Sequence, residues 1–186
     1  LPPNSFLLTM SVLLPTRATH ISEFMDDPAC DVPKLNNTYK QFYVVNQFLS
    51  GWYRIYNVYL KPRLAVASTV LDIGCGGGDV LRNLAAWSKR DGLDVSFTGI
   101  DPDVRALEYA RSRATPPTVQ FCKATSTELV QAGKKFDIII SNHVLHHLQN
   151  DEVYALCKDS EQLANKFVLH NDIRRSGLAY AGFSLT

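Results

Sequence analysis

Apolar positions follow two different periods along this chain. Over residues 38–64, apolar and aromatic side chains recur at steps of three and four residues, which is the period of a helix with one buried face. Gly51 is expected to divide this segment into two helices, and Pro62 lies near its end. The segment is either an ordinary packing helix or a lid over a small-molecule pocket.

Beyond Thr69, short apolar runs alternate with helical stretches. The pattern predicts strands over residues 70–75, 95–101, 119–122, 136–141 and 166–171, with helices over 79–89, 103–113 and 151–164. Strands that alternate with helices of this length imply right-handed crossovers and a parallel sheet. We therefore predict an α/β fold, with a doubly wound, mainly parallel sheet and helices on both faces.

The composition is that of a globular domain. The chain has 186 residues, of which 46% are hydrophobic and 20% charged. The 19 Lys and Arg nearly balance the 18 Asp and Glu without any run of like charges, so the basic footprint of a nucleic-acid binder is absent from the sequence. No apolar stretch reaches the roughly 20 residues that span a bilayer. The four scattered cysteines are typical of free thiols in a reducing compartment, which predicts a cytoplasmic protein.

The strongest chemical signal is Asp-Ile-Gly-Cys-Gly-Gly-Gly at residues 72–78, where the first predicted strand ends. Glycines there let the backbone turn sharply and approach a ligand closely. The dinucleotide pattern G-x-G-x-x-G fails, because its third glycine would fall on Asp79. The pattern present is D-x-G-x-G-x-G, and its leading acid, Asp72, suits a cationic ligand group better than a pyrophosphate.

A second acid, Asp101, stands at the end of the second predicted strand and is followed by Pro102. The carboxyl ends of neighbouring parallel strands meet at one edge of a sheet, so we expect Asp101 beside the glycine turn. A carboxylate there can accept hydrogen bonds from both hydroxyls of a ribose. The alternative is that Asp101 caps the helix that follows it.

Four features in this order resemble the class I S-adenosylmethionine-dependent methyltransferases: the glycine motif, Asp101, the strand 136–141, and Asn-His-Val-Leu-His-His-Leu at residues 142–148. The resemblance runs from Val70 to the end of the chain. It implies a Rossmann-like sheet, S-adenosylmethionine as cofactor and S-adenosylhomocysteine as product, with Asp101 at the ribose. The cofactor-binding residues that it implies are Asp72, Gly74, Cys75, Gly76, Gly78, Asp101, Pro102, Thr125, Ser126 and Asn142.

Two further segments, residues 23–28 and 171–176, are similar to small-molecule methylases of the quinone and polyketide type. This narrower resemblance implies a small aromatic or enolic acceptor and direct displacement at the donor methyl group. The chain departs from the family at Thr125-Ser126, where an Asp-Ala pair often receives the adenine amino group. A hydroxyl accepts a hydrogen bond more weakly than a carboxylate does.

A second departure concerns the sheet, because only five of the seven family strands can be identified. We expect the C-terminal strands to be missing from the chain, which would leave one side of strand five open. An open side favours association, so a homodimer is a candidate assembly. The expected organisation is an N-terminal tail over residues 1–35, a helical lid segment over 36–68 and a methyltransferase core over 69–186.

His143, His146 and His147 are predicted at the start of a helix, at positions i, i+3 and i+4. This spacing leaves three alternatives: metal ligands, a general base, or polar residues packed beside the site. Imidazole titrates near ~6.5 and could take a proton from a phenol or enol during methyl transfer. We therefore assign His143 and His146 as the candidate catalytic residues and expect no bound metal.

The predicted function is S-adenosylmethionine-dependent methyl transfer to a small-molecule acceptor. A catalytically silent, methyltransferase-like binding module is one alternative. A nicotinamide oxidoreductase is another, and both the failed dinucleotide pattern and the acid at Asp72 disfavour it.

Overall fold

Five parallel strands form one sheet in the order β3-β2-β1-β4-β5. The computed structural model describes residues 29–48 and 51–172 of the protein. The central strand is β1, whose Asp72 pairs with Gly99 of β2 on one side and with Ile140 of β4 on the other. The strands are β1 (Ser68–Ile73), β2 (Val95–Asp101), β3 (Val119–Lys123), β4 (Phe136–Asn142) and β5 (Ala164–Asn171). The predicted α/β class and parallel sheet are confirmed.

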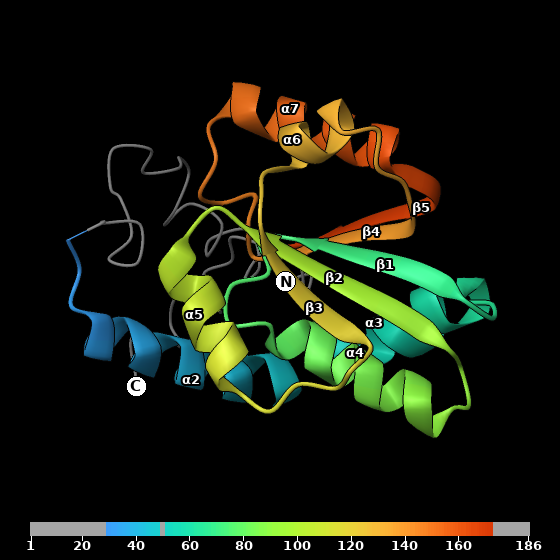
Figure 1. Cartoon of the computed structure of the whole chain (residues 1–186), viewed down its shortest axis with the longest axis horizontal. Helices are drawn as coiled ribbons and strands as arrows, with labels where there is room; N and C mark the ends of the chain where they lie inside the picture. Colours follow the sequence, from blue (N-terminus) through green and yellow to red (C-terminus); the bar gives the residue numbers. More distant parts are fainter. Residues whose placement is uncertain (1–28, 49–50, 173–186) are drawn as a thin grey trace, which may run out of the picture.

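Helices cover both faces of this sheet (Figure 1). One face carries α2, α3, α4 and α5, and the other carries α6 and α7. The chain winds from β1 toward β3 and then returns to β4 and β5 on the other side of β1. In sheets of this kind, ligands bind at the carboxyl ends of the strands where the winding reverses. The helices are α2 (Val32–Phe48), α3 (Trp52–Ile55), α4 (Asp79–Arg90), α5 (Val104–Ser112), α6 (Ser126–Gln131) and α7 (Asn150–Leu163).

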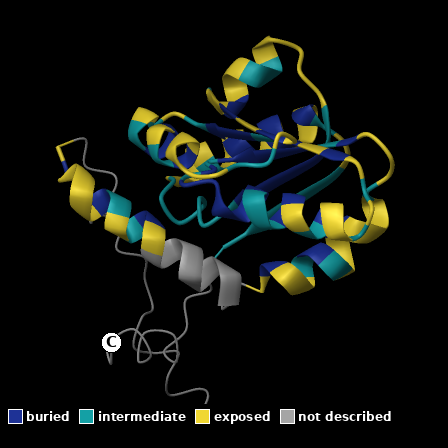
Figure 2. Ribbon diagram, turned by 60° about the horizontal axis from the view of Figure 1, so that its bottom comes forward, coloured by how far each residue is buried: buried dark blue, intermediate teal, exposed yellow. Residues whose placement is uncertain are grey.

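Each face of the sheet has its own hydrophobic core, because successive side chains of a strand point to opposite faces. Figure 2 shows the strands largely buried and the outer surfaces of the helices exposed. Val70, Ile138 and Ile140 belong to the core beneath α4. Leu71 and Ile139 belong to the core that faces α7. The near-continuous apolar runs in β1 and β4 therefore reflect burial on both sides.

The aromatic N-terminal segment is part of the first core. Trp52, Tyr56 and Leu60 are each exposed by 1% or less. They lie on α3 and on a turn of π-helix, η2 (Tyr56–Leu60), which a short 3₁₀ turn, η3 (Lys61–Arg63), follows. The packing interpretation is confirmed for these three side chains. Gly51 precedes α3 with a left-handed φ of 68°, so the predicted break is confirmed as well.

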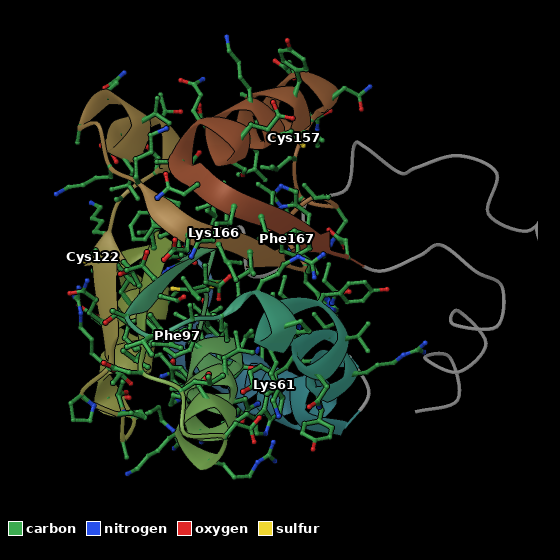
Figure 3. The ribbon with its side chains drawn as sticks, turned by 90° about the vertical axis from the view of Figure 1, so that its right-hand side faces the viewer. Lys61, Phe97, Cys122, Cys157, Lys166 and Phe167 are labelled. Carbon is green, nitrogen blue, oxygen red and sulfur yellow. The ribbon has the colours of Figure 1, made fainter. Side chains whose placement is uncertain are left out.

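This segment reaches the far strand of the sheet. The guanidinium of Arg63 lies 4.4 Å from the centre of the Phe167 ring on β5. Figure 3 shows Phe167 on β5 and Cys122 on β3, the two edge strands. Among the described residues, β5 pairs with β4 alone. The sequence motif at residues 23–28 and the part of the later motif beyond Asp172 lie outside the described residues.

One local prediction is wrong, and one helix was not predicted. The three histidines do not begin a helix: residues 143–149 form a turn, in which His143 has a left-handed φ of 58°, and α7 begins at Asn150. The short helix α6 was not anticipated, since six residues are too few to show a helical period. No helix in residues 29–48 or 51–172 is long and apolar enough to cross a membrane.

Burial of the N-terminal segment can be tested with two substitutions on the same π-helical turn. Leu60 is 1% exposed, so Leu60→Ala should leave a cavity and lower the free energy of unfolding by about 2–5 kcal/mol. Val58 is 51% exposed, so Val58→Ala should change it by less than about 0.5 kcal/mol. Urea denaturation measures both. Equally small effects would show that the segment does not share the core.

Candidate functional site

The glycine turn, residues 74–78, connects β1 to α4 at the carboxyl edge of the sheet. Its backbone is tied to the neighbouring strand, because the N–H groups of Gly74 and Cys75 both donate to the carbonyl of Ile100, at 2.8 and 3.0 Å. Gly74, Gly76 and Gly78 all have positive φ, between 49° and 72°. The turn is thus held in one shape that side chains other than glycine rarely allow.

Gly74 and Gly76 differ in what surrounds them. A Cβ at Gly74 would lie 2.6 Å from Val144, so glycine here lets the turn 143–149 pack against the glycine turn. At Gly76 the nearest atom would be 3.9 Å away, on the ring of Tyr39. Gly76 therefore borders open space at the carboxyl edge. Gly78 is closed off, since a Cβ there would meet the ring of Phe121 at 2.3 Å.

Asp101 joins the end of β2 to the glycine turn. Its Oδ2 accepts a hydrogen bond from the N–H of Gly76 at 2.9 Å, and its Oδ1 accepts one from the N–H of Asp103 at 2.9 Å. The helix cap is Asp103, whose side chain accepts from the N–H of Arg105, so the capping alternative for Asp101 is wrong. Pro102, between the two acids, is exposed. A carboxylate offers about four acceptor positions, so Asp101 has capacity for further donors.

Acidic groups surround the glycine turn. Asp72 is 1% exposed, and its Oδ1 is buried without a hydrogen-bond partner in the described part of the chain. Burial raises the pKa of Asp72 well above its usual value, and the charges of Asp79 and Asp101 raise it further. Burial also raises the pKa of Asp101, against the effect of its two backbone hydrogen bonds. A cationic group placed here would stabilise all three carboxylates.

Cys75 faces the core instead of the open edge. Its side chain is buried under the turn, and a Cβ added at Gly99 would lie 2.8 Å from its sulfur. Burial is the main reason that the pKa of this thiol is raised well above its usual value. Cys75 can therefore serve a ligand through its backbone only.

Thr125 and Ser126 follow β3 and begin α6. Thr125 caps this helix: its N–H donates to the Glu128 carboxylate at 2.7 Å, and the N–H of Glu128 donates to its hydroxyl at 3.3 Å. The hydroxyl of the buried Ser126 donates to Asp159 of α7 at 2.8 Å. Both side chains are thus engaged within the fold, and their contact with a cofactor stays a prediction.

The turn 143–149 is linked to the end of β5 by a histidine and an acid. Nδ1 of His146 lies 2.6 Å from Oδ1 of Asp172, and the backbone N–H of His146 donates to Oδ2 of the same carboxylate at 3.1 Å. Asn142 accepts a hydrogen bond from the side chain of Asn171 at 2.9 Å. The N–H of His143 donates to the carbonyl of Asn171, also at 2.9 Å. The structure therefore brings Asn142, His143 and His146 together.

The three histidines form one cluster in this turn. The ring centres of His143 and His146 are 6.0 Å apart, and those of His146 and His147 are 4.2 Å apart. Burial lowers the pKa of His143, although the charge of Asp172 opposes the shift. Within the described ranges, no group of three or more His, Cys, Asp or Glu side chains is arranged to hold a metal ion.

Sequence reasoning missed two residues of this region. Tyr39 of α2 is 5% exposed and lies against Gly76 and Gly77, but its only signal in the sequence was a position in a helical period. In the sequence, Asp172 is simply one residue of the segment 171–176 and has no assigned role. Asp172 directly follows β5, and β5 pairs with β4. Asp172 therefore lies beside the residues that follow β4, and this is the signal that could have identified it.

The known proteins that this chain resembles are methyltransferases. Residues 70–166 match the family model described as "Methyltransferase domain". The chain is 28% identical over 115 residues to the mitochondrial ubiquinone biosynthesis O-methyltransferase of Arabidopsis thaliana, which covers 60% of this chain and 34% of that protein. It is 32% identical over 96 residues to the ubiquinone biosynthesis O-methyltransferase of Rhizobium etli, which covers 50% of this chain and 36% of that protein. The chain spans about a third of the length of these curated relatives.

Among solved structures, the plantazolicin methyltransferase BpumL, in complex with a pentazolic desmethylPZN analog and SAH, has a TM-score of 0.56 at 20% identity. The match covers 88% of this chain and 60% of that one. The methyltransferase domain of bacterial CtHen1 has a TM-score of 0.52 at 19% identity, covering 67% and 65% of the two chains. These likenesses show a shared fold.

The buried carboxyl of Asp72 should make stability depend on pH. Its pKa lies above the usual 3.8 in the folded protein, so the folded state retains a proton that the unfolded state loses as the pH rises above about 4. Asp72→Asn removes this titration. The variant should gain stability over the parent with rising pH, by at most about 1.4 kcal/mol per pH unit. Urea denaturation from pH 4 to pH 8 tests this, and parallel stability curves would contradict it.

Proposed function

The chain belongs to the methyltransferase domain family, and we propose that it transfers a methyl group from S-adenosylmethionine to a small-molecule acceptor. One observation carries the proposal above the others. The open, left-handed Gly76 is hydrogen-bonded to Asp101, so the glycine turn and the acid of the next strand form one preorganised surface. Preorganised polar groups bind a ligand without first having to be ordered.

The residues at this edge fit the chemistry of the donor. Asp72, Asp79 and Asp101 favour a positive charge, and the donor carries a sulfonium and an ammonium group. Asp101 has acceptor capacity for the ribose hydroxyls, and Gly76 leaves room for the ligand to approach the backbone. When bound, S-adenosylmethionine supplies an electrophilic methyl group that a nucleophile can displace.

We assign the acceptor side to the turn 143–149. With its proton on Nδ1, His146 donates to Asp172, and Nε2 is then the basic nitrogen of the ring that takes a proton from an acceptor hydroxyl. Asp172 acts as a positioning residue, since it holds both the ring and the backbone of His146. Burial favours the neutral form of His143, which therefore suits a hydrogen bond to the acceptor.

The acceptor that we propose is the hydroxyl of an aromatic or enolic small molecule. Two relatives bear the name ubiquinone biosynthesis O-methyltransferase, which supports oxygen as the nucleophile and a quinone-like ring. A polyketide-like enol would present the same acidic hydroxyl to His146. The homodimer through the open side of β5 and the cytoplasmic location also stay predictions.

A catalytically silent donor-binding module is the second candidate. One observation favours it: Thr125 caps α6 with the hydroxyl that would otherwise face the adenine amino group. Calorimetry with S-adenosylmethionine and, in parallel, with NAD separates a methyl donor site from a dinucleotide site. Turnover with a panel of catechols and enols then separates an enzyme from a silent module, because a silent module would bind the donor and methylate none of them.

Gly76→Val should abolish binding of S-adenosylhomocysteine, because its side chain would fill the open space beside the turn and strain a φ of 49°. Gly92→Val is the matched control. Gly92 also has a left-handed φ, of 70°, with no atom within 4 Å of an added Cβ, and it lies at the opposite end of α4. Both variants should lose about 1–2 kcal/mol of stability. Isothermal titration calorimetry should show that Gly76→Val alone loses affinity for S-adenosylhomocysteine. Normal affinity in Gly76→Val would refute the assignment of the glycine turn as the donor site.

Asp172→Asn should lower kcat at least tenfold while leaving the affinity for S-adenosylhomocysteine unchanged, because the variant holds His146 in the wrong tautomer. The acid limb of the pH–rate profile should also move to lower pH, since the imidazolium loses its neighbouring carboxylate. Asp151→Asn, at an exposed acid in the first turn of α7, is the control and should change neither. A pH–rate profile that does not shift in Asp172→Asn would show that Asp172 has a structural role only.

A further inference from the structure

A cavity of about 500 Å³ lies in the helical layer between α2, the beginning of α4 and the end of α5. Figure 1 shows these three helices on the same face of the sheet. The cavity touches the glycine turn at Gly77, but neither Asp72 nor Asp101 lines it. Its volume is in the usual range for a site that takes a small organic ligand. It is therefore a second concave surface, which adjoins the carboxyl edge of the sheet at Tyr39, Gly77 and Asp79 and opens away from it toward the end of α5.

The charged side chains that line this cavity are mostly cationic. Lys40, Arg82 and Arg113 line it, against the single acid Asp79. The guanidinium of Arg82 is fixed in place, because it donates to the carbonyls of Gly77 and Ala110 and so bridges the glycine turn to α5. A fixed guanidinium is well suited to bind the oxygens of a carboxylate or phosphate.

Electrostatics within the cavity also favour an anion. Burial is the leading cause that lowers the pKa of Arg82, and the positive charge of Arg113 lowers it further. The negative charge of Asp79 raises the pKa of Arg82 by more than Arg113 lowers it, so the net positive charge of the cavity comes from Lys40 and Arg113. An anion between the two arginines would replace the repulsion between them with two attractions.

Two tyrosines give the cavity an aromatic side. The rings of Tyr39 and Tyr109 lie with their centres 5.2 Å apart and their planes inclined by 34°. Both rings line the cavity, one from α2 and one from α5. Neighbouring aromatic side chains of this kind pack well against a further flat ring. An inorganic ion would leave this aromatic side unused.

We propose that this cavity is a binding site for a small aromatic anion, distinct from the site at the carboxyl edge. The anionic group, a phosphate or a carboxylate, lies among Lys40, Arg82 and Arg113, and the ring lies beside Tyr39 and Tyr109. The site depends on the juxtaposition of α2 with α4 and α5. It does not depend on the methyl transfer proposed above.

Phenyl phosphate, benzoate, inorganic phosphate and benzyl alcohol are suitable probes for calorimetry with the full 186-residue chain. At least one of the two aromatic anions should bind, and the tighter of them identifies the preferred anionic group. Inorganic phosphate and the neutral benzyl alcohol should each bind at least tenfold more weakly. Binding of none of the probes, or equal binding of inorganic phosphate, would overturn the proposal.

Arg113→Gln is the variant of choice, because Arg113 is exposed whereas Arg82 holds two backbone carbonyls. It should weaken binding of the aromatic anion at least tenfold, since it removes a charged hydrogen-bond donor. Lys89→Gln removes the same charge from an exposed position on α4 outside the cavity and should have no effect. Equal losses in the two variants would indicate a nonspecific charge effect and overturn the site.

Competition separates this site from the donor site. Saturating S-adenosylhomocysteine should leave the affinity for phenyl phosphate or benzoate within twofold of its value in the free protein. Displacement of the aromatic anion by S-adenosylhomocysteine would show that the two ligands share one site, which overturns the proposal.

Discussion

The hydrogen bond from the N–H of Gly76 to Asp101 determines the shape of the whole carboxyl edge. It ties the turn after β1 to the end of β2, beside the two N–H groups that the carbonyl of Ile100 receives from the same turn. Because Gly74 has no side chain, Val144 from the loop after β4 can pack against the same turn. The ends of three strands thus form one surface. Burial at this surface raises the pKa values of Asp72 and Asp101.

The sequence allowed the sheet to be predicted because burial on both faces leaves a simple pattern. Residues 95–101 were predicted as a strand with the bounds that β2 has, and β4 was expected from its run of isoleucines. The glycine motif and Asp101 were expected to meet, and they do. These features depend on local pattern and on the rule that parallel strands end at one edge, so no tertiary contact was required to predict them.

What could not be predicted depends on contacts between distant residues. The sequence around His143 predicts the start of a helix. In the structure, the N–H of His143 donates to the carbonyl of Asn171, and its φ is left-handed. The hydroxyl of Thr125 was expected to contact the cofactor, but Thr125 and Glu128 together cap the N-terminus of α6. The partnership of His146 with Asp172 joins residues that follow two different strands. Local propensity and periodicity do not predict such pairings, because the pairings form only when the folded chain places the strands side by side.

Burial of Trp52, Tyr56 and Leu60 has a consequence for how the chain must fold. Their core also contains Ile138 and Ile140, and Arg63 covers Phe167 near the other end of the described chain. The native contacts therefore include many of high sequence separation, which slows folding because long loops must close first. A fragment limited to the family-matched residues 70–166 would lack these three side chains and open to water the part of the core that they fill. The smallest cooperative unit is thus larger than the region that defines the family.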